Sequence, residues 1–295
     1  MLLSILIPTY NFDCTKLVED LLQQLPGNSE IIVGDDGSTD QGIKQRLSHI
    51  SQMPTCRLYA SSRNIGRSAI RNRLARQAQG EWLLYLDSDA EVIHEDFLQN
   101  YLQEIQHNPG IKVLCGGIKH PDKLPCKEVS LRYNYEKKAE PRFTAANRRK
   151  NEYSNFRTFN FMIRRDIMCE HPFDENIVKY GYEDVILGAW LQRDNIHIHH
   201  IDNEMMNGDI ETNPRFVEKT EEAMQTLATI PDIIRSHSAL VVHYNRLQHF
   251  HLTGLIRIFH RLFGRTIRRN LCSDSPRLTL FNFYKLSYYA CLKKE

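Results

Sequence analysis

The chain has 295 residues, which is enough for one large domain and a smaller appendage. Its 38 Lys and Arg stand against 36 Asp and Glu, a formal net charge of +2, so we expect no nucleic-acid partner. The 14 Gly and 11 Pro are ordinary usage, which excludes a fibrous or disordered chain. The seven cysteines show no Cys-x-x-Cys spacing, which argues against a zinc ribbon or a disulfide framework and favours a reducing compartment.

The amino-terminal apolar run has features of a strand rather than of a signal peptide. It ends at Pro8 and has neither a basic leader nor a small-residue cleavage site. No apolar stretch approaches the roughly 20 residues that a membrane-spanning helix needs. We therefore expect a cytoplasmic protein, with peripheral attachment to the inner face of the membrane as the alternative.

In the first third of the chain, short apolar runs alternate with helical patterns. Strands are predicted at residues 2–7, 30–33, 57–60 and 82–86. Between them, helices are predicted to begin near Thr15, after Asp40 and near Ser68, and Gly80 is placed to end the third. Strands separated by helices of this length predict an α/β fold with a mostly parallel central sheet and helices on both faces.

In the rest of the chain, the predicted strands and helices alternate less regularly. Residues 116–157 are rich in charge, with prolines at 121, 125 and 141, and predict a largely solvated excursion. A strand at 159–163, a helix opening at 180–184, a strand near 197–201 and a helix near 216–227 follow. The last sixty-odd residues are predicted to be mostly helical. We divide the chain into a larger domain, 1–228, and a C-terminal helical extension, 229–295.

Polar clusters follow three of the predicted strands. They are Thr9-Tyr10-Asn11, Asp35-Asp36 and Asp87-Ser88-Asp89. The run Asp-Asp-Gly-Ser-Thr-Asp alone would suit a turn and a helix cap. Three clusters at the carboxyl ends of parallel strands instead indicate a ligand site at one sheet edge. Because Mg²⁺ and Mn²⁺ prefer carboxylate oxygens beside phosphates, the acidic turn at 87–89 predicts a divalent-cation site.

Five stretches of the chain form a recognisable series. They are Ile-Pro-Thr-Tyr-Asn (7–11), Val-Gly-Asp-Asp-Gly-Ser-Thr-Asp (33–40), Asn-Ile-Gly-Arg-Ser-Ala-Ile-Arg-Asn (64–72), Gly-Glu-Trp-Leu-Leu-Tyr-Leu-Asp-Ser-Asp (80–89) and Gly-Tyr-Glu-Asp-Val (181–185). With them the chain resembles the family-2 glycosyltransferases of the nucleotide-diphospho-sugar transferase (GT-A) fold, over roughly its first two-thirds. The resemblance implies inverting transfer of a sugar from a nucleotide-sugar donor, UDP-sugar first, to a saccharide or lipid-linked saccharide acceptor. It also implies a Mn²⁺ or Mg²⁺ cofactor and a role in cell-surface glycan synthesis.

The resemblance further implies roles for individual residues. Asp184 matches the catalytic base, and Asp89 matches the metal ligand. Asp36 is expected to accept from the imide N–H of uracil, Asp87 to face the ribose, and Arg71 to lie near the diphosphate. The full set expected to bind nucleotide or substrate is Thr9, Tyr10, Asn11, Asp35, Asp36, Asn64, Arg71, Asp87 and Glu183.

Several alternatives stay open at this point. Glu183 and Asp184 would also suit the first turn of a helix, where the dipole favours acidic residues. Asn207 stands where many relatives carry a metal-ligating histidine, which leaves open a nucleotide-sugar-binding protein with little or no activity. A dinucleotide-dependent oxidoreductase is disfavoured because no Gly-x-Gly-x-x-Gly follows the first strand. The absence of a Gln-x-x-Arg-Trp signature favours single transfers over processive synthesis.

A helix predicted over 252–269 has two unlike faces. One face carries apolar side chains: Leu252, Leu255, Ile256, Phe259, Leu262 and Phe263. The opposite face carries Arg257, Arg261, Arg265 and Arg268. This pattern suits a helix lying in an anionic membrane interface. It suits equally a helix that packs its apolar stripe on the protein and turns the arginines to water, which we expect of this helix.

Overall fold

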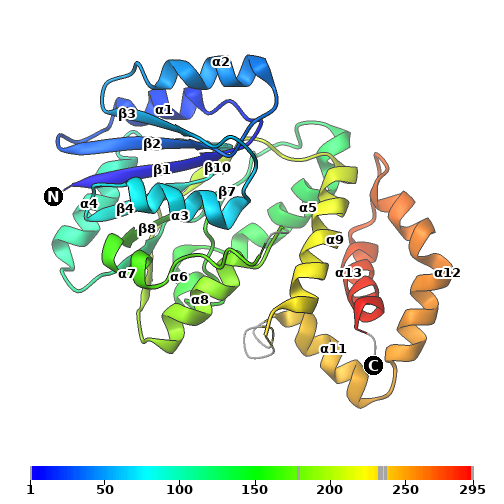
Figure 1. Ribbon diagram of the computed structural model, residues 1–295. Helices are drawn as coiled ribbons and strands as arrows, with labels where there is room; N and C mark the ends of the chain where they lie inside the picture. The colour runs from blue at the N-terminus through cyan, green and yellow to red at the C-terminus, as the bar shows by residue number, and fades with distance from the viewer. Residues whose placement is uncertain (1, 178–179, 232–234, 236–237, 294–295) are drawn as a thin grey trace. The chain divides into compact units, whose positions relative to one another are not determined.

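The computed structural model describes residues 2–177, 180–231, 235 and 238–293 (Figure 1). The chain forms two compact units. The first consists of Met1–Lys119, Arg142–Val178 and Glu183–Asp209, and the second of His120–Pro141, Lys179–Tyr182 and Ile210–Glu295. The second unit includes helix α9 (Asn213–Thr229), although the sequence pattern predicts this helix within the larger domain, 1–228.

A seven-stranded sheet forms the centre of the first unit. Its strands are β1 (Leu3–Thr9), β2 (Ser29–Asp35), β3 (Cys56–Ala60), β4 (Trp82–Leu86), β6 (Val113–Cys115), β8 (Asn160–Arg164) and β9 (Ile198–His200). They lie in the order β3-β2-β1-β4-β8-β6-β9, and only β8 runs antiparallel to its neighbours. The mostly parallel sheet confirms the predicted fold class.

Helices cover both faces of this sheet (Figure 1). Because successive side chains of a strand point to opposite faces, Ile5 and Ile7 pack on one side and Leu6 on the other. The first side is covered by α1 (Thr15–Leu22), α2 (Gln41–Ile50) and α4 (Phe97–His107). The second is covered by α3 (Arg67–Gln77), α7 (Arg165–Glu170) and α8 (Glu183–Arg193). Both layers bury continuous apolar cores, as the alternating sequence pattern predicts.

A small second sheet adjoins the turn after β4. It consists of β5 (Ala90–Glu91), β10 (Met205–Asn207) and β7 (Ile118–Lys119), with β10 in the middle. Asn207 pairs with Ala90 in the antiparallel ladder, and the N–H of Gly208 donates to the carbonyl of Asp89 at 2.9 Å. The ladder therefore fixes residues 206–208 beside the acidic turn.

Two local predictions were wrong. Helix α3 ends at Gln77, not at Gly80. Gly80 instead lies against β1, where an added Cβ would come within 2.5 Å of the Ser4 nitrogen. The segment 116–157 is not a solvated excursion either. It contains η1 (Lys127–Val129), α5 (Ser130–Ala139), η2 (Glu140–Arg142) and α6 (Ala145–Arg149), and it buries Leu131 and the Arg148 side chain. Its charges line exposed helix faces or pair with one another, while its few apolar residues reach the cores.

The second unit is helical. Besides α5 and α9 it contains α11 (Ala239–His249), α12 (Thr253–Leu271) and α13 (Leu278–Leu292). Its core is formed by Leu131, Val217, Ile267, Leu271, Phe281 and Tyr284. Within the described ranges, no helix combines the length and apolarity required to cross a bilayer.

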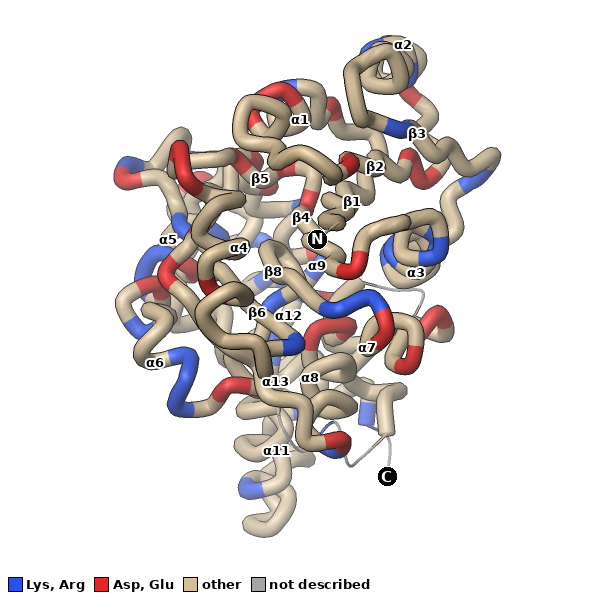
Figure 2. Tube along the Cα trace, turned by 90° about the vertical axis from the view of Figure 1, so that its left-hand side faces the viewer, with Lys and Arg blue, Asp and Glu red and all other residues tan. Residues whose placement is uncertain are grey.

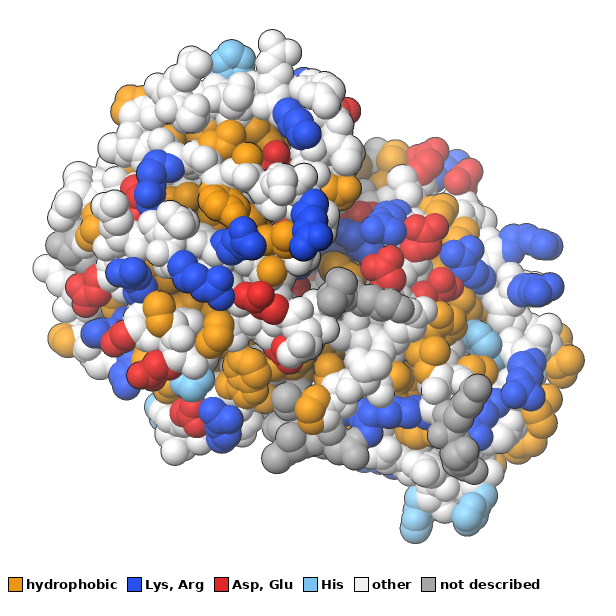
Figure 3. Space-filling view, viewed as in Figure 1, with side chains coloured by type: hydrophobic (Ala, Val, Ile, Leu, Met, Phe, Trp, Pro, Cys, Tyr) orange, Lys and Arg blue, Asp and Glu red, His pale blue; other side chains and the backbone are white. Residues whose placement is uncertain are grey.

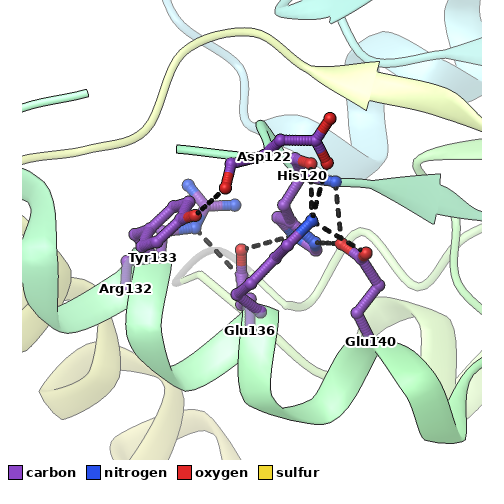
Figure 4. Close-up of polar contacts among 7 residues, drawn as sticks. His120, Asp122, Arg132, Tyr133, Glu136 and Glu140 are labelled. Carbon is purple, nitrogen blue, oxygen red and sulfur yellow. Dashed lines mark hydrogen bonds and ion pairs between the residues drawn. The ribbon is translucent and has the colours of Figure 1, made fainter. Parts of the chain in front are cut away.

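A buried histidine ties residues 120–122 to α5 within this unit (Figure 4). The two ring nitrogens of His120 lie 2.9 Å from Glu136 Oε2 and 3.0 Å from Glu140 Oε2. Lys137 donates to the carbonyl of His120 and pairs with Glu140. Burial raises the pKa of Glu136, but hydrogen bonding to His120 and the charge of Arg132 outweigh burial and hold that pKa below its ordinary value. Contacts with Arg132, Lys137 and the His120 ring thus satisfy the acidic side chains of α5 and its end, which explains how so charged a segment packs.

Candidate active site

The loops after β1 and β2 hold each other at the carboxyl edge of the sheet. Asn11 Oδ1 accepts hydrogen bonds from the N–H of Thr39 at 2.7 Å and of Asp40 at 3.2 Å, and the Asn11 N–H donates to Ser38 Oγ at 2.8 Å. Asn11 has φ 50°, a left-handed conformation that asparagine tolerates. Tyr10 lies at the surface with 47% of its area exposed. The side chain of Asn11 thus holds the two loops together, whereas the exposed ring of Tyr10 is available to a ligand.

Asp36 is buried and organises the approach to α3. Its Oδ1 accepts from the N–H of Ile65 at 2.8 Å and its Oδ2 from the N–H of Gly66 at 3.0 Å, while its own N–H donates to the carbonyl of Thr9. Burial raises the pKa of Asp36 even though these hydrogen bonds oppose the shift. Each carboxylate oxygen keeps a further acceptor position. Asp36 therefore can hold the loop and still accept one more donor.

The neighbouring residues complete this edge. Asp35 Oδ1 accepts from the N–H of Ser38 at 2.8 Å, so Asp35 shapes the turn. Gly37 has φ +73°, and a Cβ there would lie 2.3 Å from the backbone carbon of Arg63. Only glycine allows the loop after β2 to approach the loop between β3 and α3 this closely. Asn64 is exposed in the loop between β3 and α3.

Arg71 lies at the centre of a charged network in the first unit. It is fully buried, its Nη2 lies 2.6 Å from Asp87 Oδ1, and its Nη1 lies 3.4 Å from Glu183 Oε1. Arg67, one helical turn earlier on the same face, pairs with Asp87 and with Glu183. The guanidinium carbon of Arg71 lies 5.2 Å from the centre of the Phe173 ring. The network joins α3, the turn after β4 and the start of α8.

The two arginines decide the charge state of Asp87. Burial raises the pKa of this carboxyl, but Arg67 and Arg71 outweigh burial and hold the pKa below its ordinary value. Asp87 is therefore ionised at neutral pH. The positive charges of Arg67 and Arg71 are balanced by the two carboxylates of Asp87 and Glu183, so the network is close to neutral.

Asp184 has the opposite shift. Its Oδ1 accepts from the N–H of Val185 at 2.8 Å, and its Oδ2 lies 3.6 Å from Arg157 Nη1. Burial raises the pKa of Asp184, Arg157 opposes the shift, and adjacent Glu183 reinforces it, so that the net pKa is raised. A carboxylate with a raised pKa binds a proton more readily, as a general base must.

Asp89 and Asn207 supply oxygen atoms next to the second sheet. Asp89 follows the buried strand β4, and the β5–β10 ladder places Asn207 opposite Ala90. Carboxylate and amide oxygens suit a hard cation such as Mg²⁺ or Mn²⁺. The part of the chain that the structure describes contains no group of three or more His, Cys, Asp or Glu that could hold a metal.

Sequence reasoning missed three contributors to this site. Arg67 lies within the stretch 64–72 and four residues before Arg71, so helical spacing could have identified it. Arg157 and Phe173 gave no local signal, because only the folded chain brings them to Asp184 and Arg71.

A parallel sheet with acidic turns at its carboxyl edge, an arginine-bearing helix and an acidic helix start defines a nucleotide-sugar transferase fold of the GT-A type. The chain matches the model of the family described as "Glycosyl transferase family 2" over residues 4–171, more than half of its length. The chain belongs to this family.

Known relatives and structures agree with the assignment. An uncharacterized glycosyltransferase of Haemophilus influenzae is 32% identical over 136 residues, which cover 45% of this chain and only 42% of that relative. A mannosyltransferase from Pyrobaculum calidifontis, solved with GDP-Man and Mn²⁺, has a TM-score of 0.59 at 14% identity and covers 97% of this chain and 85% of its own. Glucosyl-3-phosphoglycerate synthase from Mycobacterium tuberculosis, solved with Mn²⁺, UDP and glucosyl-3-phosphoglycerate, has a TM-score of 0.54 at 16% identity and covers 78% of this chain and 81% of its own. At these identities the two structures establish a shared fold.

Proposed function

We propose that the chain is an inverting, non-processive glycosyltransferase that moves a sugar from a nucleotide-sugar donor onto an acceptor hydroxyl. UDP-sugar is the proposed donor, and a saccharide or lipid-linked saccharide of a cell-surface glycan is the proposed acceptor. The observation that carries the proposal is the network in which Arg71 joins Asp87 to Glu183, next to Asp184. It connects a candidate diphosphate site to a candidate base.

The nucleotide is proposed to bind over the loops after β1 and β2. Asp36 accepts from the base, since its buried carboxylate retains acceptor capacity beside the Ile65 and Gly66 donors. Exposed Tyr10 offers an aromatic face, and Thr9 and Asp35 hold the loops in place. Complexes of fold relatives with UDP and with GDP-Man support a nucleotide at this type of site.

The donor's diphosphate is proposed to lie between Asp89 and the two arginines of α3. A divalent cation held by Asp89 would neutralise charge on the departing diphosphate. The guanidinium groups of Arg67 and Arg71 are proposed to donate hydrogen bonds to the phosphates, and Asp87 and Glu183, which balance their charge, keep these side chains oriented before the donor arrives. Mn²⁺ in both fold relatives supports the choice of cation.

Asp184 is proposed to act as the general base. It takes the proton from the acceptor hydroxyl while that oxygen forms a bond to the anomeric carbon, and the bond from that carbon to the diphosphate oxygen breaks. Attack from the side opposite the leaving group inverts the anomeric centre. The raised pKa of Asp184 suits this proton transfer.

The substitution Asp184→Asn tests this proposal, because it keeps size and removes basicity. We expect the transfer rate to fall by about 10²–10⁴, the usual contribution of general-base assistance, with donor affinity unchanged. The assay measures sugar transfer and donor hydrolysis across nucleotide sugars with Mn²⁺, and UDP and GDP binding by calorimetry. Wild-type turnover in the variant would eliminate Asp184 as the base.

A second candidate function rests on Asn207, which stands where the resemblance to family-2 enzymes implies a metal-ligating histidine. In that case the protein binds nucleotide sugars but transfers them poorly. Mn²⁺-dependent donor binding by the wild-type chain, with neither hydrolysis nor transfer, would favour this function over catalysis.

A further inference from the structure

Helix α12 faces outward with its apolar side. Leu255, Ile258, Leu262 and Phe263 are 64%, 53%, 68% and 48% exposed, and Phe259 at 39% lies among them. Figure 3 shows hydrophobic and basic side chains side by side along the edge that α12 forms. The expectation that this helix packs its apolar stripe on the protein is therefore wrong.

The inner stripe of α12 explains the reversal. The residues facing the rest of the unit are Thr253, Arg257, His260, Gly264, Ile267 and Leu271, spaced alternately by three and four. Arg257 donates from Nε to the carbonyl of Ala290 and from Nη2 to that of Lys293, both at 2.9 Å. These contacts satisfy carbonyls at the end of α13, which no helical N–H can reach. His260 contacts Ser287 Oγ at 2.9 Å.

The arginines divide between the two sides. Arg257 and Arg268 point into the unit, the latter pairing with Glu221 at 2.8 Å, so they do not form the solvent face expected from the sequence. Arg261, Arg265 and Arg269 are exposed, and their spacing of four places them along one edge of the apolar stripe. The outer surface is thus an apolar stripe with a basic border, which we call the outer stripe.

The surroundings of the outer stripe are also basic. Residues 239–293, which contain α11, α12 and α13, carry nine Lys and Arg and one acidic residue, Asp274. The exposed surface of α11 adds Val242, Arg246, His249 and Phe250, which line a shallow hollow. In Figure 2, α11 carries basic but no acidic colour. Formal charge is thus concentrated here although the whole chain is nearly neutral.

We propose that the outer stripe binds the surface of an anionic lipid bilayer, with the apolar side chains among the acyl-chain ends and Arg261, Arg265 and Arg269 at the headgroups. An apolar stripe bordered by cations is the composition that such interfaces select. Pairing with a second copy of this chain is disfavoured, because a two-fold interface would bring the basic borders together. The proposal is independent of the proposed transfer reaction.

Vesicle flotation of the full chain tests this inference. The chain is expected to float with vesicles of phosphatidylcholine and phosphatidylglycerol at low salt and to be released from them at high salt. It should not float with vesicles of pure phosphatidylcholine. The triple variant R261Q/R265Q/R269Q should bind about 100-fold more weakly. The variant L255S/L262S/F263S should lose binding while keeping all three arginines. Both should keep the wild-type Tm, because the altered side chains are exposed.

A matched control removes the same charge elsewhere. Lys44, Lys112 and Lys123 are exposed and lie outside residues 239–293, so K44Q/K112Q/K123Q should float like the wild type. The inference is overturned if the full chain stays in solution with anionic vesicles, or if this control weakens binding as much as R261Q/R265Q/R269Q. It is also overturned if light scattering shows a dimer that L255S/L262S/F263S dissociates.

Discussion

Asp87 and Asp184 show how one charged network prepares two carboxyls for different tasks. Arg67 and Arg71 lower the pKa of Asp87, whereas burial and Glu183 raise that of Asp184 against the opposing effect of Arg157. Pairs of acidic groups with divergent pKa values are common where one must stay ionised and the other must accept a proton. This divergence supports the roles proposed for the two residues.

Arg157→Gln should change the pH dependence of transfer. Arg157 lowers the pKa of Asp184, so its removal should raise that pKa further. A base is active when deprotonated, so the acidic limb of the kcat profile should move to higher pH, with activity lost at low pH and recovered as pH rises. Arg193→Gln, which removes an exposed ion pair with Asp194 on the surface of the first unit, is the control and should not move the limb. An unshifted limb in R157Q would separate Arg157 from the base.

Arg71→Met should destabilise the fold much more than Arg67→Met. Arg71 is fully buried, and removing it leaves the mostly buried carboxylate of Asp87 with the partly exposed Arg67 as its remaining arginine partner, so we expect a loss toward the about 3–5 kcal/mol of a broken buried pair. Arg67 is 38% exposed, so water replaces part of its interaction and we expect about 1 kcal/mol. Urea unfolding measures both, and R71M/D87N should recover part of the loss. Equal losses for the two single variants would show that burial does not set their contribution.

At the scale of elements, the β5–β10 ladder fixes residue 207 beside the acidic turn after β4. Asn207→His should tighten Mn²⁺ binding in the presence of UDP, because imidazole is a better ligand than an amide oxygen for this ion and the ladder holds the residue beside the acidic turn. Titration of Mn²⁺ by electron paramagnetic resonance measures it, with Asp89→Ala as the variant expected to lose the ion. Unchanged Mn²⁺ affinity in N207H would place residue 207 outside the ligand shell.

The elements of the sheet could be predicted closely, and their exceptions have physical causes. The apolar runs of β1, β2 and β4 are buried on both faces, which makes them visible in sequence, whereas the edge strand β3 is only partly buried. Gly80 looked like a helix end, but it serves a close approach to Ser4 that no local pattern encodes. The charge-rich segment around Leu131 looked solvated because its polar contacts, such as that of the His120 ring with Glu136, form only in the folded chain.

Helix α12 shows a second limit of sequence. Its periodicity defines two faces but not which of them is buried. Arg257 and His260 face inward because they form hydrogen bonds with carbonyl and hydroxyl groups of α13 and the residue after it. These groups lie some thirty residues further along the chain, so the local sequence of α12 does not reveal them. The division of function between residues 1–228 and 229–295 likewise stays a prediction.

Across the whole molecule, the formal charge of +2 conceals two different regions. Residues 239–293 have eight more basic than acidic residues, so the remainder has six more acidic than basic ones. The network of Arg67, Arg71, Asp87 and Glu183, in contrast, is nearly neutral and mostly buried, with Arg67 38% exposed. Ions in solution screen exposed charges far more than buried ones.

Salt should therefore separate the two binding events of this protein. Raising ionic strength should release the chain from anionic vesicles, because exposed arginines and lipid headgroups are screened within about 10 Å at 0.1 M salt. Donor affinity with saturating Mn²⁺ should change much less over the same series. Calorimetry with UDP and vesicle flotation in identical buffers compare them. Parallel salt responses would contradict the separation.

The opposite demands on the two sides of α12 also restrict how its length can change. One inserted residue advances the following part of a helix by about 100°. An insertion between Leu262 and Phe263 would put Phe263 at the place of Gly264, where an added Cβ already meets the His260 ring at 3.1 Å. It would put Thr266 in place of the buried Ile267 and turn the basic border away from its edge. Insertions of about seven residues, two helical turns, would preserve both sides. Natural length variation in this helix should therefore occur in multiples of the heptad.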